Sequence, residues 1–220
     1  IADRDWSSDV CSSDLIALYI PIHWEETFGR DLFWEQGAAC DIVWGRTRGY
    51  NTLATLAYTG DEGPLRWNFE AFYTIISRSN WVVQKLLNKQ QKVALTAIET
   101  RSLGEAYFMR GMGHFYMAYR YGTDKQGVPF VRYEDFPEGY DQSIPTQQPS
   151  VIDNYKYIID DMDQAIKYLP RFEAYGEEDR GRAHQAAAVA YKAKVYAYWA
   201  TWDQTQWNNV IRRPDRKSVV

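Results

Sequence analysis

The sequence predicts an all-α fold, a tetratricopeptide-like scaffold of helix pairs with long loops. Apolar residues recur at helical spacing in each long stretch between the loops. Small residues stand inside these stretches, where a second helix could approach closely. Ala165 is followed five residues later by Pro170, a spacing typical of tetratricopeptide repeats. Because such helix pairs bury a continuous core only against their neighbours, we expect consecutive helices to pack on one another.

Composition restricts the class of partner. The chain carries a formal net charge of −4, whereas a nucleic-acid partner would call for a basic face. Aromatic residues make up 16% of the chain, with 17 Tyr and 9 Trp. Tyr and Trp combine a flat apolar ring with a polar edge, so an excess of them favours a binding surface. No apolar run reaches the roughly 18 residues that a membrane span needs.

Both ends of the chain look foreign to the protein. Residues 5–15, DWSSDVCSSDL, and residues 215–220, DRKSVV, resemble translated sequencing adapters. We therefore expect residues 1–15 and 215–220 to have no defined role. Residues 16–214 are expected to form one helical domain, cut from a longer gene and truncated at both ends. Cys11 falls in the first foreign stretch, which leaves Cys40 alone and excludes a disulfide within the domain.

The first part of the domain is expected to be loop-rich. Residues 16–30 are predicted to become helical after Pro21. Residues 31–63 hold five glycines and several aromatic residues, which indicates a long irregular connection with one short helix. Long ordered loops usually carry function.

Two long helices follow. The first opens at Pro64 and runs to about Gln90, because its apolar residues fit a 3.6-residue period. The second organises the chain. Its apolar stripe contains Phe108, Met112, Phe115 and Tyr119, and a second stripe of small side chains contains Gly104, Gly111 and Ala118. Residues 92–103 are expected to be a polar lead-in to this helix, and Gly122 a left-handed cap that ends it.

Two more helices are predicted after a proline-rich loop. Ser150 is a plausible N-cap, with Asp153 three residues later, and Pro170 stops the helix that Ser150 begins. The final helix follows Gly181 and is expected to continue to about Ile211. A short strand pair near residues 127–131 is the most β-structure that we expect.

Three motifs in these helices, taken in order, resemble the SusD/RagB glycan-binding lipoproteins of Bacteroidota outer membranes. The first carries a GEA-x-F-x-R…YG…VP signature. Its matching residues are Gly104, Glu105, Ala106, Phe108, Arg110, Phe115, Tyr121, Gly122, Val128 and Pro129. The second motif comprises Val151, Tyr155, Ile158, Asp161, Met162, Ala165, Leu169 and Pro170. The third motif begins at Gly181-Arg182-Ala183. The helix of residues 64–90 matches more loosely, through Trp67 and Asn80.

The resemblance implies an incomplete SusD-like fold and a function. Such a protein captures an oligosaccharide at the cell surface and passes it to a SusC-like TonB-dependent transporter in the outer membrane. It binds without catalysis and needs no cofactor or metal. Its contact with the membrane runs through a lipid anchor that would lie upstream of this sequence. Which sugar or peptide is bound stays open.

A candidate sugar site lies in the loop before the first long helix. A sugar ring stacks on a flat aromatic surface, and its hydroxyls bond to carboxylate, amide or guanidinium groups. This set is supplied by Asp41, Trp44, Arg46, Arg48 and Tyr50, with Asn51 beside them. The alternative is that Trp44 and Tyr50 only plug the loop onto the helices.

Two other functions remain open. A tetratricopeptide scaffold would bind proteins or peptides. An all-helical glycoside hydrolase would need two carboxylates roughly 5–10 Å apart. Asp160, Asp161 and Asp163 lie near one another, but Asp160 and Asp163 are better explained as part of a solvated helix face. His23, His114 and His184 lack metal-ligand spacing, and His114 is expected to be a packed or capping residue.

Overall fold

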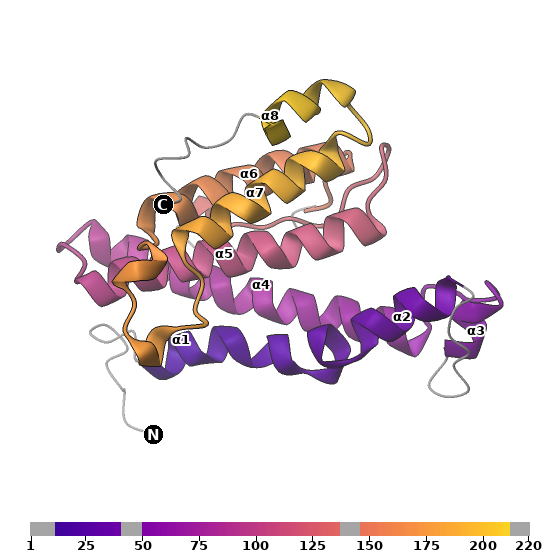
Figure 1. Cartoon of the computed structure of the whole chain (residues 1–220), viewed down its shortest axis with the longest axis horizontal. Coiled ribbons are helices and arrows are strands. Elements are labelled where there is room, and N and C mark those ends of the chain that lie inside the picture. Colours follow the sequence, from indigo (N-terminus) through magenta and orange to yellow (C-terminus); the bar gives the residue numbers. More distant parts are fainter. Residues whose placement is uncertain (1–11, 41–49, 137–145, 212–220) are drawn as a thin grey trace.

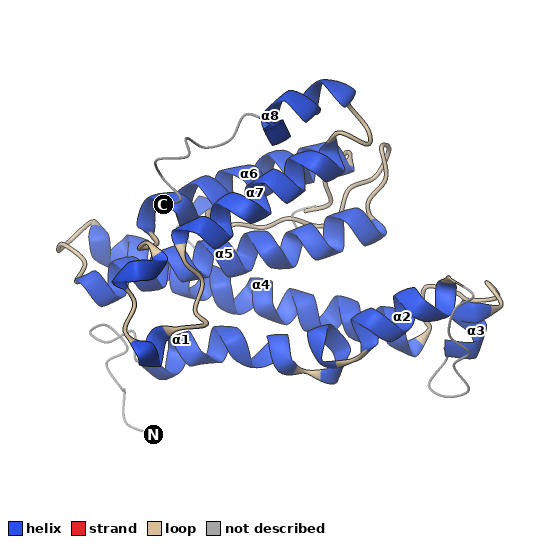
Figure 2. Cartoon of the chain, viewed as in Figure 1, coloured by secondary structure: helices blue, strands red, loops and turns tan. Residues whose placement is uncertain are grey.

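The computed structural model describes residues 12–40, 50–136 and 146–211 (Figure 1). Their α-helices are α1 (Ser12–Tyr19), α2 (Asp31–Ala39), α3 (Tyr50–Ala54), α4 (Gly63–Gln90), α5 (Ala97–Tyr121), α6 (Val151–Tyr168), α7 (Gln185–Trp199) and α8 (Trp207–Ile211). Within these ranges no strand forms, and β-pairing is limited to an isolated antiparallel bridge between Pro129 and Gln147 (Figure 2). The predicted all-α fold is confirmed.

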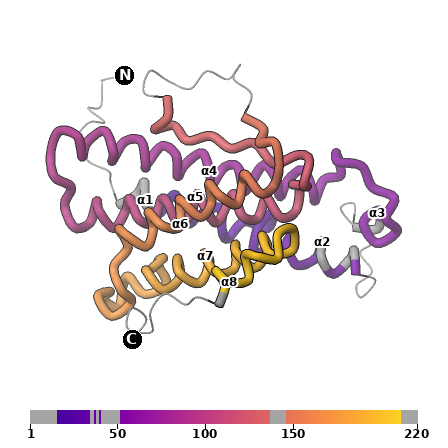
Figure 3. The backbone as a smooth tube through the Cα atoms, turned by 90° about the horizontal axis from the view of Figure 1, so that it is seen from above, coloured from indigo at the N-terminus to yellow at the C-terminus, as the bar shows by residue number. Residues whose placement is uncertain are grey.

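The long helices pack in chain order. α4 packs against α5, α5 against α6, and α6 against α7, so that each helix contacts the next along the chain (Figures 1 and 3). This is the arrangement of tetratricopeptide-like helix pairs that the sequence predicts. Among the described residues, no helix is long and apolar enough to cross a membrane.

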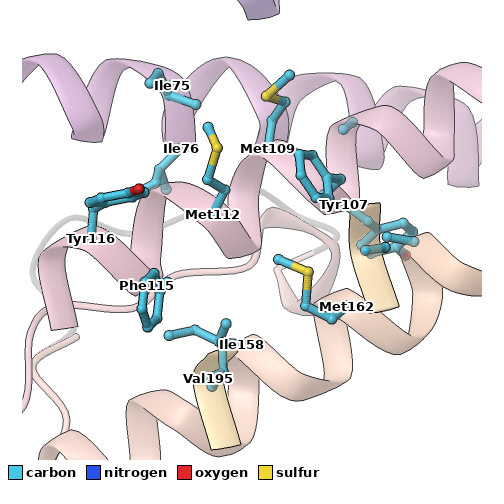
Figure 4. Close-up of a cluster of buried hydrophobic side chains, with 14 of the residues drawn as sticks. Ile75, Ile76, Tyr107, Met109, Met112, Phe115, Tyr116, Ile158, Met162 and Val195 are labelled. Carbon is cyan, nitrogen blue, oxygen red and sulfur yellow. The ribbon is translucent and has the colours of Figure 1, made fainter. Parts of the chain in front are cut away.

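α5 forms the centre of the core. Every residue from Ser102 to Ala118 is buried, because other helices cover α5 on several sides. Figure 4 shows Met109 and Met112 pointing toward Ile75 and Ile76 of α4, while Phe115 points away from them, toward Ile158 of α6 and Val195 of α7. α5 therefore has to be apolar around most of its circumference.

The stripe of small residues on α5 faces α6, as predicted. A Cβ atom on Gly104 would lie 2.9 Å from the backbone nitrogen of Leu169, and one on Gly111 would lie 2.6 Å from the Met162 side chain. Gly122 differs from our expectation. Its φ of −87° and ψ of 150° are extended rather than left-handed. Glycine is needed there because a Cβ would lie 2.6 Å from the carbonyl oxygen of Ala118 and 2.9 Å from Val151.

α5 begins earlier than its apolar stripe suggests. The predicted polar lead-in is wrong, because residues 97–103 form the first turns of this helix. Its start is a capping box: the Thr96 hydroxyl accepts a bond from the Glu99 amide at 3.3 Å, and the Glu99 carboxylate accepts one from the Thr96 amide at 2.9 Å. The N-cap expected at Ser150 is present, since its hydroxyl accepts a bond from the Asp153 amide.

The two ends of the domain also differ from prediction. α1 ends before Pro21, which lies in a 3₁₀ turn at Ile20–His23, and the helix expected after Pro21 is present only as a short π-helix at Glu25–Gly29. Two short helices, α2 and α3, stand where one was expected. The last predicted helix is divided, because the chain turns after Trp199 and starts α8 at Trp207. α1 begins at Ser12, inside the first foreign-looking stretch. That residues 1–15 and 215–220 have no role stays a prediction.

Candidate functional site

Most of the predicted sugar site lies outside the described residues. Asp41, Trp44, Arg46 and Arg48 belong to residues 41–49, and Tyr50 is the first residue of α3. Their assignment to a site therefore stays a prediction. The structure describes the two helices that flank this segment, α2 on its N-terminal side and α3 on its C-terminal side.

The flanking helices are anchored to the rest of the fold. α2 packs against both α3 and α4. Leu53 of α3 is buried and packs with Leu65 of α4. At the other end, the Asp31 side chain is buried at the start of α2, and its Oδ1 atom accepts a hydrogen bond of 2.6 Å from Nε of Arg30. The segment 41–49 therefore starts and ends on packed helices.

Aromatic side chains are exposed beside this segment. Phe33 is 62% exposed and Trp34 is 49% exposed, both on α2, and Tyr58 is exposed shortly after α3. The Arg30 guanidinium lies 5.5 Å from the centre of the Trp34 ring. Exposed rings next to a guanidinium provide stacking surfaces and hydrogen-bond donors, which is the chemistry that a sugar site uses. Sequence reasoning overlooked these three residues because it sought rings and polar groups within one glycine-bounded segment.

The signature residue Arg110 lies in the core and holds together four segments. It is fully buried. Its Nε and Nη2 atoms donate to both Asp161 oxygens, at 2.9 and 2.7 Å, and its Nη1 and Nη2 atoms donate to both Glu134 oxygens, at 2.8 and 2.7 Å. Nη1 also donates to Oδ1 of Asn80 at 2.8 Å. Arg110 thus joins α4, α5, α6 and the loop after α5, and all of these bonds are charge-assisted.

The electrostatics of this cluster favour the charged forms of Arg110 and Glu134, whereas burial raises the pKa of Asp161 despite the opposing charge of Arg110. Burial disfavours charge on Arg110, but Asp161 and Glu134 more than offset it, so the pKa of Arg110 lies above its usual value. Burial also disfavours charge on Glu134, but the hydrogen bonds from Arg110 hold the pKa of Glu134 below its usual value. Asp161 was considered within an acidic group whose other members are solvated. Asp160 and Asp163 are indeed exposed, whereas Asp161 is a buried partner of Arg110.

A second charged cluster joins the first motif to the third. The buried Glu105 carboxylate accepts a 3.2 Å hydrogen bond from Arg182 and a 3.0 Å bond from the hydroxyl of Tyr19. Arg182 also bonds to Asp179, at 2.7 Å. Gly181, just before Arg182, has a φ of +105°, which side chains rarely adopt. The GEA and GRA motifs therefore come together to hold α1, α5 and the loop before α7.

The Val128-Pro129 segment is held by a buried asparagine. The Asn154 side chain accepts a bond of 2.8 Å from the Val128 amide and donates one of 3.0 Å to the Val128 carbonyl. The next residue, Phe130, stacks on His114 with ring centres 3.9 Å apart. The buried motif residues Glu105, Arg110 and Val128 thus contribute to the fold.

His114 is packed in the core, as predicted. Its Nδ1 atom lies 3.0 Å from the Arg110 carbonyl oxygen, which can only accept, so Nδ1 carries the proton. Its Nε2 atom is buried and makes no hydrogen bond within the described part of the chain. Burial, and then the positive charge of Arg110, hold the pKa of His114 well below its usual value. The folded protein therefore keeps this histidine neutral.

Stability is expected to fall as the pH drops below about 6.5. In that range the unfolded chain binds a proton at His114, whereas the folded chain does not. One such proton contributes a slope of up to about 1.4 kcal/mol per pH unit. Urea unfolding between pH 5 and pH 7.5 should show a shallower slope for His114→Phe. The matched control is His23→Gln, at an exposed histidine, which should keep the original slope. An unchanged slope in His114→Phe would contradict a neutral buried histidine.

The described residues contain no group of three or more His, Cys, Asp or Glu side chains that could hold a metal. Among them, His184 is the N-cap of α7 and accepts a bond from the Ala187 amide at 3.3 Å.

The roles of Glu134 and Glu105 were not foreseen from the sequence. A usable signal was available for Arg110 and Asp161, since opposite charges on two otherwise apolar helix faces indicate a buried pair.

The fold is a tetratricopeptide-like helical scaffold, and the candidate sugar site is a segment between two short helices. Comparison with known families matches residues 38–197 to a SusD-like family described as "Starch-binding associating with outer membrane". This match covers more than half of the chain, and it includes the whole predicted sugar site. The chain belongs to the SusD-like family.

Similar proteins support the assignment. A SusD-like protein of Bacteroides ovatus is 26% identical over 155 residues, which are 70% of this chain and 26% of that protein. A SusD homologue of Bacteroides thetaiotaomicron, solved by crystallography, has a TM-score of 0.73 and 22% identity over 90% of this chain and 38% of its own. A laminarin-binding SusD-like protein has a TM-score of 0.69 and 20% identity, over 90% of this chain and 41% of its own. The chain thus spans well under half the length of these relatives.

Proposed function

We propose that this chain binds an oligosaccharide at the segment between α2 and α3, with Trp44 and Tyr50 as stacking surfaces. Asp41, Arg46 and Arg48 are the proposed hydroxyl partners. The observation that carries the proposal is the match of residues 38–197 to a family described as starch-binding. The exposed rings of Phe33 and Trp34 in the first turn of α2, and of Tyr58 after α3, support it.

The proposed mechanism is reversible binding without catalysis. The rings contact the apolar faces of sugar residues, and the charged side chains form bidentate hydrogen bonds with neighbouring hydroxyls. In the whole protein, a surface lipoprotein would bind the oligosaccharide at this site and pass it to a SusC-like TonB-dependent transporter. The family's description as associated with the outer membrane supports that location.

Trp44→Ala is expected to remove most of the affinity for the oligosaccharide and to leave thermal stability nearly unchanged. An aromatic residue at the centre of a binding site contributes about 2 kcal/mol or more, roughly thirtyfold in affinity. The measurement is affinity electrophoresis against a panel of polysaccharides, with calorimetry of the same variant. Laminarin and starch are the first ligands to test, since one relative binds laminarin and the family is described as starch-binding.

Trp207→Ala, at an exposed tryptophan of α8, is the matched control and should leave both properties unchanged. If Trp44 instead plugs the loop onto the helices, Trp44→Ala should cost about 3–5 kcal/mol of stability and leave binding unchanged. Release of shorter sugars from a bound polysaccharide would favour the hydrolase. Binding of peptides in place of polysaccharides would favour the protein-binding scaffold.

A further inference from the structure

A hollow lies on the C-terminal half of α4. α3 lies near the N-terminal end of that helix (Figures 1 and 3). The volume of the hollow is about 430 Å³. The residues that line it are Gln84, Leu87, Asn88, Gln90, Gln91 and Glu134. The hollow is therefore separate from the segment between α2 and α3.

Carboxamides dominate the lining. Asn88, Gln90 and Gln91 are exposed, and their side chains make no hydrogen bond among the described residues. Each carboxamide offers two donors and an accepting oxygen, which matches a hydroxyl group that both donates and accepts. Leu87 is the one apolar residue of this lining. A protein partner would favour an apolar centre, so the composition fits a sugar better than a protein.

Glu134 adds a fixed acceptor. Both of its oxygens are held by Arg110, at 2.7 and 2.8 Å, while 18% of its side chain remains exposed. Because Arg110 keeps the carboxyl ionised, it can accept a charge-assisted hydrogen bond from a hydroxyl. The carboxylate is also immobile before any ligand arrives, which lowers the entropy cost of binding.

An exposed tryptophan lies on the same face of α4. Trp81 is 65% exposed. Trp81, Gln84, Asn88 and Gln91 follow one another at steps of three, four and three residues, which places them along one side of the helix. At about 1.5 Å of rise per residue, Trp81 lies about 10 Å along the helix from Asn88 and about 15 Å from Gln91, so only a chain of several sugar residues could contact all of them.

We propose that this face of α4 is a second saccharide subsite, in which one residue of an oligosaccharide stacks on Trp81 and the following residues bond through their hydroxyls to Asn88, Gln91 and Glu134. The inference rests on the proposed function, because it assigns a second contact with the same class of ligand. A neutral sugar is favoured, since the charged group of the hollow is a carboxylate and the chain has a net charge of −4. A polysaccharide that contacts both sites would bind more tightly than a short oligosaccharide.

The test uses the full chain labelled with nitrogen-15, titrated with maltoheptaose and with laminariheptaose. Nuclear magnetic resonance follows the indole signals of Trp44 and Trp81 and the side-chain amides of Asn88 and Gln91. With at least one of the two sugars, we expect saturable shifts at Trp81, Asn88 and Gln91. The double variant Asn88→Ala, Gln91→Ala should weaken binding at Trp81 at least tenfold and leave the Trp44 response unchanged.

The control is the double variant Gln204→Ala, Asn208→Ala, which removes the same two residue types from exposed positions near α8. It should leave the Trp81 response unchanged. Shifts at Trp44 without shifts at Trp81 would overturn the second subsite and leave the proposed function intact. Shifts at Trp81 alone would support the subsite and count against the site between α2 and α3. No shifts with either sugar would overturn both.

Discussion

Replacing Arg110 by methionine is expected to lower the free energy of unfolding by about 3–5 kcal/mol. The change leaves the buried carboxylate of Asp161 without its bidentate partner, and it removes the hydrogen bonds that hold Glu134 and Asn80. A buried charge without a partner is far costlier than a buried pair. Urea unfolding at pH 7, followed by circular dichroism at 222 nm, a wavelength that reports helix, measures the loss.

Arg66→Met provides the matched control. Arg66 is exposed on α4 and pairs with Glu70 at 3.8 Å, so its loss should cost no more than about 0.5 kcal/mol. Adding Asp161→Leu to Arg110→Met should recover part of the stability, because it removes the carboxylate left unpaired. A cost below about 1 kcal/mol for Arg110→Met alone would contradict the role of this cluster.

Phe115→Ala is expected to cost a similar amount, about 3–5 kcal/mol, through loss of packing. Phe115 is fully buried at the junction of α5, α6 and α7. Its ring meets Tyr198 of α7 edge-to-face at 5.1 Å, and the Lys194 ammonium lies 5.2 Å from its centre. Truncation would leave a cavity on which α7 depends, so we expect the melting temperature to fall and α7 to lose hydrogen-exchange protection first.

Phe172→Ala is the control for this change. Phe172 is exposed in a turn between α6 and α7, and its loss should stay within about 0.5 kcal/mol. If both phenylalanine variants melted alike, Phe115 would not be part of the core that holds α7. Uniform loss of protection over α4 to α7 would indicate that α7 does not open separately.

The signature residues of this chain explain the fold better than they explain the ligand. Arg110 and Glu105 each connect distant segments through buried hydrogen bonds. Such residues specify which helices meet, whereas sugar contacts need exposed rings and polar groups. The family can thus be identified from core residues that do not themselves identify the ligand.

The sequence by itself determined the long helices, their order and the stripe of small residues where another helix packs closely on α5. These features depend on the helical period, on caps and on small residues, all of which act over one or two turns. Where a local rule was overlooked, as with the capping box at Thr96, the predicted boundary was wrong. The same local information also favoured Trp44 and Tyr50 for a site, which stays a prediction.

Only the tertiary structure decided which polar groups become partners. Arg110 and Asp161 lie 51 positions apart, and Glu105 and Arg182 lie 77 apart. No pattern within one helix states that such residues meet, because their pairing requires several helices to pack at once. The need for glycine at position 122 arises in the same way, since Val151 of α6 occupies the space that a side chain would need. The amide-lined hollow beside Glu134 likewise exists because Arg110 brings the loop after α5 against α4.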